Sequence, residues 1–246
     1  MKFIDAHVHI GNGVRAQLDV VSLLRQMDQA ELALAVVCPL DRFIAVDNKQ
    51  GNDFVINAVQ SQPDRLVGLA TANPWFGQSA VEEVRRALSK GLAGVKIHSV
   101  LQGFRLSEHI IDPILEVAAE FDVPVYAHTG TAGVAEPFHL IELARRFSTI
   151  NFIMGHGGAS DYYNDSVRGL EFVENVWLET SRNGPANYCL WKNAGLMDKI
   201  VFGSNAPNYI PQVEIETLKD VFTDPQDQEK ILSLNIQNVF KERLPL

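Results

Sequence analysis

The sequence predicts an α/β protein, a (β/α)8 barrel formed as a single domain by residues 1–246. Apolar, β-branched runs of strand length recur along the chain, and segments with helical spacing of apolar residues separate them. Each unit of strand and helix takes about 25 to 33 residues, the length of a parallel crossover. Such units fill all 246 residues, which is the usual size of a closed barrel.

The strand-length runs lie at 2–9, 34–38, 66–70, 93–98, 123–128, 150–156, 176–180 and 200–204. Helical periodicity is clearest at 20–27, 81–88 and 141–147. A doubly wound sheet would carry a third glycine soon after Gly11 and Gly13, and the sequence lacks it. The tail at 227–241 has an apolar helical face, so we expect a C-terminal helix packed across the exterior or the base of the barrel.

Composition and charge exclude several classes of protein. With 46% hydrophobic and 21% charged residues, the chain can form a folded core. The net charge of −9, without a basic stripe, argues against nucleic acid as a partner. No apolar run reaches the roughly 18 to 20 residues of a membrane span, and the first residues lack a secretion signal. Cys38 and Cys189 are typical of reduced core thiols. We therefore expect a cytoplasmic protein with no membrane partner.

Five of the 7 histidines end predicted strands. They are His7, His9, His98, His128 and His156. In a parallel barrel the chemistry lies at the carboxyl ends of the strands, so these imidazoles are predicted to share one rim.

His7 and His9 are two residues apart, so strand alternation places both on one face, together with Asp5. A single buried histidine is commonly bonded to backbone carbonyls, but two at this spacing favour metal ligation. His128, which precedes a glycine-bearing loop, is the predicted third ligand. Three imidazoles suit Zn²⁺, with manganese, iron or nickel as alternatives, and leave a position for an exchangeable water.

His156 stands between Gly155 and Gly157. These glycines are predicted to clear space for a ligand, and we interpret His156 as an acid–base or oxyanion-stabilising residue. The alternative is a rim histidine that only orders its loop.

Four motifs, in this order along the chain, resemble those of the amidohydrolase superfamily. The most similar branch is the amidohydrolase-2 group, which includes decarboxylases of the aminocarboxymuconate-semialdehyde type. The motifs are Asp5-x-His7-x-His9, Ala127-His128-Thr129-Gly130, Gly155-His156-Gly157-Gly158 and Phe202-Gly203-Ser204-Asn205-Ala206-Pro207. The resemblance implies a mononuclear zinc-type site with His7, His9 and His128 as ligands and His156 as the catalytic histidine.

The family ends its last barrel strand with an aspartate that binds the metal and moves the proton, and this chain has Asn205 there. An amide has no titratable proton and carries no negative charge for a cation. Four alternatives stay open: weaker metal binding with His156 as the base, catalysis without metal as in certain lactonases of this group, loss of catalysis, or an introduced substitution. Asn205 is kept as a catalytic-site residue, although asparagine before a turn is also a common cap.

Lys96 and His98 alternate onto one face of the 93–98 strand. We expect them to hold a substrate carboxylate or to shape the pocket wall. A carbamylated Lys96 that bridges two metals, as in related binuclear hydrolases, is a weaker alternative. Arg42 and Arg182, in the loops after 34–38 and 176–180, are candidate clamps for an acidic group, although loop arginines are commonly only solvated.

The leading hypothesis is a metal-dependent hydrolase of the amidohydrolase-2 type. It would use an activated water to attack a small carboxylic acid, lactone or amide. A non-oxidative decarboxylase is the second enzyme hypothesis. A catalytically impaired barrel that binds a small acidic ligand is the alternative from another class. The expected partner is a small-molecule substrate, and barrels of this kind often pair through their helices, so we also consider a homodimer.

Overall fold

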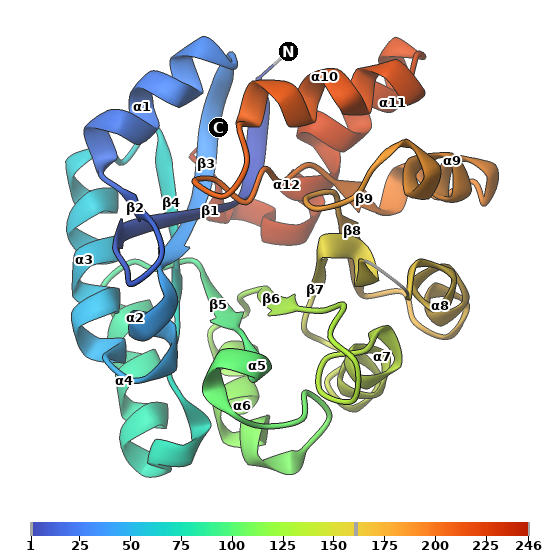
Figure 1. Ribbon diagram of the computed structural model, residues 1–246. Helices are drawn as coiled ribbons and strands as arrows, with labels where there is room; N and C mark the ends of the chain where they lie inside the picture. Colours follow the sequence, from blue (N-terminus) through green and yellow to red (C-terminus); the bar gives the residue numbers. More distant parts are fainter. Residues whose placement is uncertain (1, 160–161, 246) are drawn as a thin grey trace.

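Eight parallel strands form the barrel in the computed structural model, which describes residues 2–159 and 162–245 (Figure 1). The sheet order is β2-β1-β3-β4-β5-β6-β7-β8-β9, and only β2 is antiparallel to its neighbour. The strands are β1 (Phe3–Asn12), β2 (Gln17–Leu18), β3 (Leu32–Pro39), β4 (Leu66–Ala70), β5 (Gly94–Ile97), β6 (Val125–His128), β7 (Phe152–Gly155), β8 (Val176–Glu179) and β9 (Ile200–Val201). Each predicted strand corresponds to one of these, and β2 is a short hairpin partner of β1 that the sequence did not reveal.

The barrel closes between its last and first strands. Regular pairing in β9 ends at Val201, which is shorter than the predicted 200–204 strand. The chain beyond it bonds to β1 instead: Ala6 N–H donates to the Phe202 carbonyl and Asn205 N–H to the His7 carbonyl, each at 2.8 Å. These bonds carry residues 202–206 along β1 and bring Asn205 beside the strand that holds His7.

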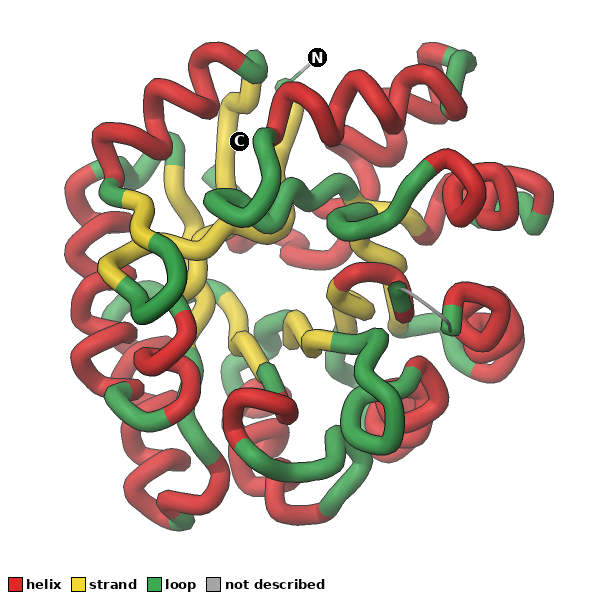
Figure 2. The backbone as a smooth tube through the Cα atoms, viewed as in Figure 1, coloured by secondary structure: helices red, strands yellow, loops and turns green. Residues whose placement is uncertain are grey.

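Helices surround the strands, as the red and yellow tube of Figure 2 shows. They are α1 (Val20–Gln29), α2 (Asp41–Ala45), α3 (Asn48–Ser61), α4 (Gln78–Ser89), α5 (Ser99–Gln102), α6 (Asp112–Glu120), α7 (Pro137–Arg146), α8 (Tyr163–Gly169), α9 (Pro185–Asn193), α10 (Pro211–Val221), α11 (Pro225–Glu229) and α12 (Asn235–Phe240). The 3-10 turns are η1 (Pro74–Phe76), η2 (His109–Ile111), η3 (His156–Gly158), η4 (Leu170–Phe172), η5 (Met197–Lys199) and η7 (Lys241–Arg243), and η6 (Lys230–Leu234) is a π-helical turn. The alternation of strand and helix therefore follows the predicted order.

The apolar core has two parts. The larger cluster lies between strands and helices and includes Val8, Val37 and Val95 from three neighbouring strands. The smaller cluster joins strand residues such as Ile4 and Leu34 to residues of α12. Since Ile4 and Leu34 lie near the amino ends of β1 and β3, the C-terminal helix covers the base of the barrel and leaves the opposite end to the site.

Among the helices of the described residues, none is long and apolar enough to cross a membrane.

Candidate active site

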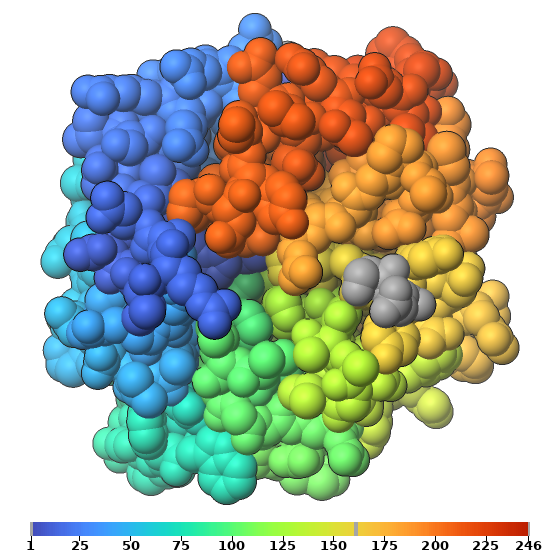
Figure 3. All heavy atoms as spheres, viewed as in Figure 1, coloured from blue at the N-terminus to red at the C-terminus, as the bar shows by residue number. Residues whose placement is uncertain are grey.

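A cavity of about 490 Å³ opens at the carboxyl ends of the strands. Figure 3 shows this hollow between the blue N-terminal, green central and orange C-terminal parts of the surface. Residues from widely separated loops line it: His9, Arg15, Ala16, Leu40, Asp41, His98, Val100, Leu101, His128, His156, Arg182, Asn205, Asn208 and Tyr209. Four of the five predicted rim histidines thus face one cavity, and His7 lies below it with 1% of its surface exposed.

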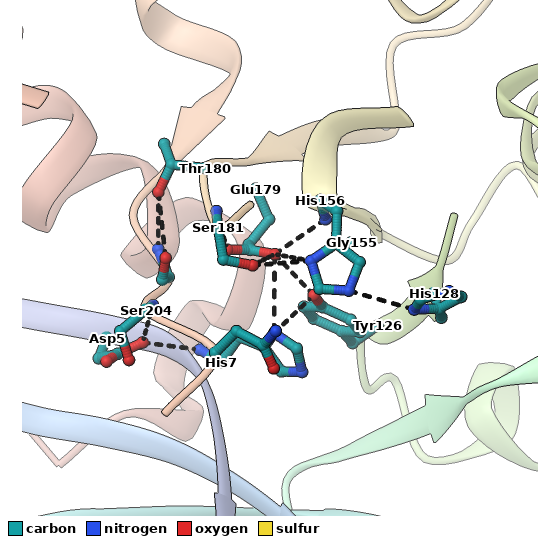
Figure 4. Close-up of polar contacts among 12 residues, drawn as sticks. Asp5, His7, Tyr126, His128, Gly155, His156, Glu179, Thr180, Ser181 and Ser204 are labelled. Carbon is teal, nitrogen blue, oxygen red and sulfur yellow. Dashed lines mark hydrogen bonds and ion pairs between the residues drawn. The ribbon is translucent and has the colours of Figure 1, made fainter. Parts of the chain in front are cut away.

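A buried carboxylate, Glu179 at the end of β8, organises the polar groups beneath the cavity (Figure 4). Its Oε2 accepts hydrogen bonds from the Tyr126 hydroxyl at 2.6 Å, from His156 N–H at 2.9 Å and from the Ser181 hydroxyl at 2.9 Å. Its Oε1 accepts from Ser181 N–H at 2.6 Å. Burial raises the pKa of Glu179, and these four hydrogen bonds oppose the rise. Because every partner donates to it, we assign Glu179 as an ionised acceptor.

This assignment fixes the protons of His7. The Tyr126 hydroxyl donates its hydrogen bond to Glu179, so its oxygen accepts from His7 Nδ1–H at 2.8 Å. His7 Nε2 is then a lone pair, and Lys96 Nζ donates to it at 2.9 Å. A buried chain therefore runs from the ammonium of Lys96 through His7 and Tyr126 to the carboxylate of Glu179.

A second chain runs from Glu179 to the cavity. The Ser181 hydroxyl donates to Glu179 and therefore accepts from His156 Nδ1–H at 2.7 Å. His156 Nε2 is left with a lone pair, which lies 3.1 Å from His128 Nδ1. His128 presents its other nitrogen to the Thr131 hydroxyl at 3.4 Å. The lone pair of His156 Nε2 therefore accepts a hydrogen bond from His128 Nδ1–H, and both imidazoles line the cavity.

The imidazoles are neutral. Burial lowers the pKa of His156 and of His7 well below the usual value, and the charge of Lys96 adds to the effect. The pKa of His128 falls to about 3 and that of His9 to about 4, again chiefly through burial. Burial also lowers the pKa of Lys96 to about 8, which leaves the side chain mostly protonated at neutral pH.

His9, the second histidine of β1, forms part of the cavity wall, and its Nδ1 bonds to the neighbouring strand β3. Its Nδ1 donates to the Pro39 carbonyl at 2.9 Å, and Cys38 Sγ lies 3.3 Å from the same nitrogen. His9 lines the cavity with 8% of its surface exposed. With Nδ1 as the donor, its Nε2 carries a lone pair.

The predicted substrate-binding residues divide into two pairs. His98 and Arg182 line the cavity, and the His98 ring stacks on His128 with centroids 3.8 Å apart. Lys96 is 1% exposed and bonded to His7, so the expectation that it grips a substrate carboxylate is not supported. Arg42 is not among the cavity-lining residues and pairs with Asp47 at 3.1 Å, as an ordinary surface arginine does.

Asn205 lines the cavity in a left-handed backbone conformation, with φ of 58°. Asparagine and aspartate tolerate this conformation better than most residues. Its backbone N–H bonds to β1, and its side-chain oxygen accepts from Asn208 Nδ2 at 3.3 Å. The residue therefore helps to close the barrel and shapes the turn, and it offers the cavity an amide in place of a charge.

Two groups of three donors lie close enough to hold a metal ion among residues 2–159 and 162–245. They are His7 with His9 and Cys38, and His7 with His156 and Glu179, and the predicted set of His7, His9 and His128 is neither of them. His128 lies two residues beyond Tyr126, and it is the Tyr126 side chain of β6 that contacts His7, while the His128 ring contacts His156 and His98.

Neither donor group fits a resident divalent ion as its members are arranged. In the group with Glu179, the hydroxyls of Tyr126 and Ser181 already bridge the donors. In the other group, the lone pair of His7 Nε2 faces the ammonium of Lys96. Burial also raises the pKa of the Cys38 thiol to about 11, which keeps it protonated while no cation is bound.

Several residues of the site were missed or left undecided at the level of sequence. Tyr126 precedes His128 by two positions, so alternation alone would have placed it on the inner face. Glu179 lies at the end of the 176–180 run, where alternation does not decide its direction, and in the structure it points inward. Ser181 and Arg15 lie in loops, where alternation gives no signal; Arg15 lines the cavity and its N–H donates to Asp41 at 3.2 Å.

The family model described as Amidohydrolase, Amidohydro_2, matches residues 4–241. The chain belongs to the amidohydrolase-2 family. One curated relative is 31% identical over 78 residues, which is 31% of this chain and 22% of that protein. It is the 2-amino-3-carboxymuconate-6-semialdehyde decarboxylase of Dictyostelium discoideum.

Two solved structures illustrate the fold of this chain. A probable 2-pyrone-4,6-dicarboxylic acid hydrolase of Acinetobacter baumannii, with citric acid bound, has a TM-score of 0.74 at 20% identity, covering 98% of this chain and 99% of that one. A 5-carboxyvanillate decarboxylase of Novosphingobium aromaticivorans, complexed with manganese, has a TM-score of 0.75 at 17% identity, covering 97% and 96%. At these identities the likeness concerns the barrel alone.

Proposed function

We propose that this amidohydrolase hydrolyses an acyl bond in a small carboxylated compound, such as a lactone or an amide. The observation that carries the proposal is the position of His156. At the cavity wall its Nε2 carries a lone pair that accepts from His128 Nδ1–H, and its Nδ1–H is held through Ser181 by the buried Glu179. An imidazole fixed in one tautomer by a buried acid is the arrangement that general base catalysis requires.

The reaction balances with the groups of this chain. His156 Nε2 removes a proton from water as the water oxygen bonds to the acyl carbon. The bond from that carbon to the leaving oxygen or nitrogen then breaks, and the imidazolium returns the proton to the leaving atom. Glu179 stabilises the transient imidazolium through Ser181 and is itself unchanged.

Substrate charge is inferred from the cavity wall. Arg182 and Arg15 line the cavity from two different loops, and Asp41 is an acidic member of the lining beside Arg15. Guanidinium groups bind carboxylates through paired hydrogen bonds. Arg182 also has φ of 61°, a strained conformation for this residue type that is typical of functional positions. These features favour an anionic substrate.

The second candidate is a non-oxidative decarboxylase. The name of the Dictyostelium relative and the fold shared with the 5-carboxyvanillate decarboxylase support it. We favour hydrolysis because His156 and water suffice for it, whereas decarboxylation requires a group that takes up the electron pair left on carbon. Zinc as a cofactor stays a prediction from the sequence.

A panel of lactones, amides and aromatic or unsaturated carboxylic acids, followed by mass spectrometry, tests the proposal. Hydrolysis adds one water to the substrate, and decarboxylation removes carbon dioxide, so the product mass separates the two reactions. We expect addition of water with wild-type protein and none with His156→Asn. Loss of carbon dioxide would overturn the hydrolase proposal in favour of the second candidate.

A further inference from the structure

Lys96 is a cation built into the floor of the site. It lies at the centre of β5, and its ammonium is directed into the barrel, where it meets His7 Nε2 at 2.9 Å. Lys96 Nζ also lies 3.7 Å from the centroid of the Tyr126 ring, an arrangement that stabilises a cation. With 1% of the residue exposed, the ammonium has no path to bulk water in this conformation.

The charge of Lys96 is balanced inside the barrel. The chain of hydrogen bonds through His7 and Tyr126 connects it to Glu179, so the buried positive and negative charges are joined by polar groups that all have partners. A buried charge is tolerated when it is paired and hydrogen-bonded in this way. Asn205 would offer a divalent ion at this site only a neutral amide. The nearby buried carboxylate of Asp5 accepts through Oδ1 from the backbone N–H groups of His7 and Ser204.

We propose that the Lys96 ammonium takes the place of a metal cation at this site, so that the chain functions without a resident metal ion. The ammonium occupies the lone pair of His7 that a metal would need, and its charge repels a second cation placed between His7 and His9. The neutral amide of Asn205 adds no negative charge that would offset this repulsion.

The test measures bound metal and needs no substrate, so its failure is distinguishable from failure of the proposed function. Protein is dialysed against Zn²⁺ and, separately, Mn²⁺ at pH 7.5, and bound metal is counted by plasma mass spectrometry. The wild-type chain is compared with Asn205→Asp, with the double variant Lys96→Met/Asn205→Asp, and with Lys199→Met. Lys199 is a partly buried lysine outside the site, which makes it the matched control.

We expect wild type, Asn205→Asp and Lys199→Met to bind below about 0.1 ion per chain at this site, and the double variant to bind about one. Site binding is defined as the part lost when His9→Ala is added. One ion per wild-type chain that disappears with His9→Ala would overturn the proposal, as would a folded double variant that gains no metal. If circular dichroism shows that the double variant does not fold, the Asn205→Asp variant decides, because it keeps Lys96. An ion bound to Asn205→Asp contradicts the proposal, and the absence of a bound ion supports it.

Discussion

Glu179 determines which nitrogen carries the proton in two imidazoles of the candidate site. Through Tyr126 it sets the tautomer of His7, and through Ser181 it sets the tautomer of His156. A carboxylate that orients an imidazole in this way contributes to catalysis without touching the substrate. Ser181 is therefore a positioning residue, and its hydroxyl can be removed without removing the base.

Ser181→Ala breaks the connection between His156 and Glu179. We expect kcat to fall by about 10- to 100-fold with little change in KM, because the substrate does not contact this hydroxyl and the imidazole loses its fixed tautomer. The pH profile of kcat should shift as well, since the imidazolium loses its carboxylate partner. Steady-state kinetics on the substrate found by the panel measures both effects.

Ser61→Ala is the control for this variant. Ser61 donates to the Ala58 carbonyl at the end of α3, away from the cavity, so its loss removes one hydroxyl without affecting the site. Equal effects of the two substitutions on kcat would show that Ser181 acts through general stability and not through His156.

Among the secondary-structure elements, the close packing of β7 against β6 holds Tyr126 and His156 in place. Gly155 ends β7 directly beneath the Tyr126 ring, and a Cβ added there would lie 2.5 to 2.6 Å from the ring and its hydroxyl. The next residues, His156 and Gly157, turn in the left-handed region, with φ of 63° and 53°. A Cβ at Gly157 would meet Trp191 at 2.4 Å. The glycines therefore allow close packing around His156, and not only space for a ligand as the sequence had suggested.

Gly155→Ala tests this packing. The backbone of Gly155 has φ of −56°, which alanine adopts readily, so only the added methyl group acts. It must displace Tyr126 from Glu179 and His7, and we expect a loss of about 1 to 3 kcal/mol in the free energy of unfolding by urea, together with reduced kcat. Gly184→Ala, where a Cβ meets nothing within 4 Å, should leave both unchanged. An unaltered Gly155→Ala protein would show that Tyr126 is not held as described.

The order of the strands and helices along the chain was predictable from the sequence. The pairing that closes the barrel between its last and first strands was harder to predict. Buried parallel strands are nearly continuous apolar runs, which is why β4 matches its predicted limits of 66–70. Closure was harder, because the chain after Val201 pairs with β1 in an irregular way that no local pattern encodes. The positions of His128 and His156 follow from where each apolar run ends, whereas β1 continues past His7 and His9 to Asn12.

The hydrogen-bond chains could not be read from the sequence. They join residues of β1, β5, β6 and β8, and the distance across a barrel depends on the order of all strands between them. His128 contacts His156, which follows the adjacent β7, and stacks on His98, and its role as a third ligand beside His7 and His9 stays a prediction. The hydrogen-bond chain from Lys96 of β5 to Glu179 of β8 connects the strands across the barrel.

At the scale of the whole molecule, burial of acidic groups makes stability depend on pH. Burial in the helical layer raises the pKa of Glu214 on α10 from 4.5 to about 7, and the charge of Glu179 adds to the rise. The folded chain therefore keeps a proton on Glu214 that the unfolded chain releases near pH 4.5. Its contribution to stability is full below that pH and is lost as the pH rises through about 7.

Glu214→Gln should remove this dependence. The full shift corresponds to about 3 kcal/mol, and solvent screening of this half-buried group reduces it to about 1 kcal/mol. We expect the variant to gain that much over wild type in urea unfolding at pH 8.5 relative to pH 4. Glu216→Gln, at an exposed position of the same helix, should show no such gain. A constant difference across the pH range would show that Glu214 is ionised equally in both states.

The turnover of His156→Asn tests the account most directly, because that imidazole is the proposed base and is held by Ser181 and Glu179. Asparagine retains a polar side chain of similar reach but cannot accept and return a proton at neutral pH. On the substrate identified by the panel, we expect kcat to fall by at least about 100-fold, while the fold measured by circular dichroism is unchanged. A folded His156→Asn protein with wild-type turnover would contradict the assignment of His156 as the base.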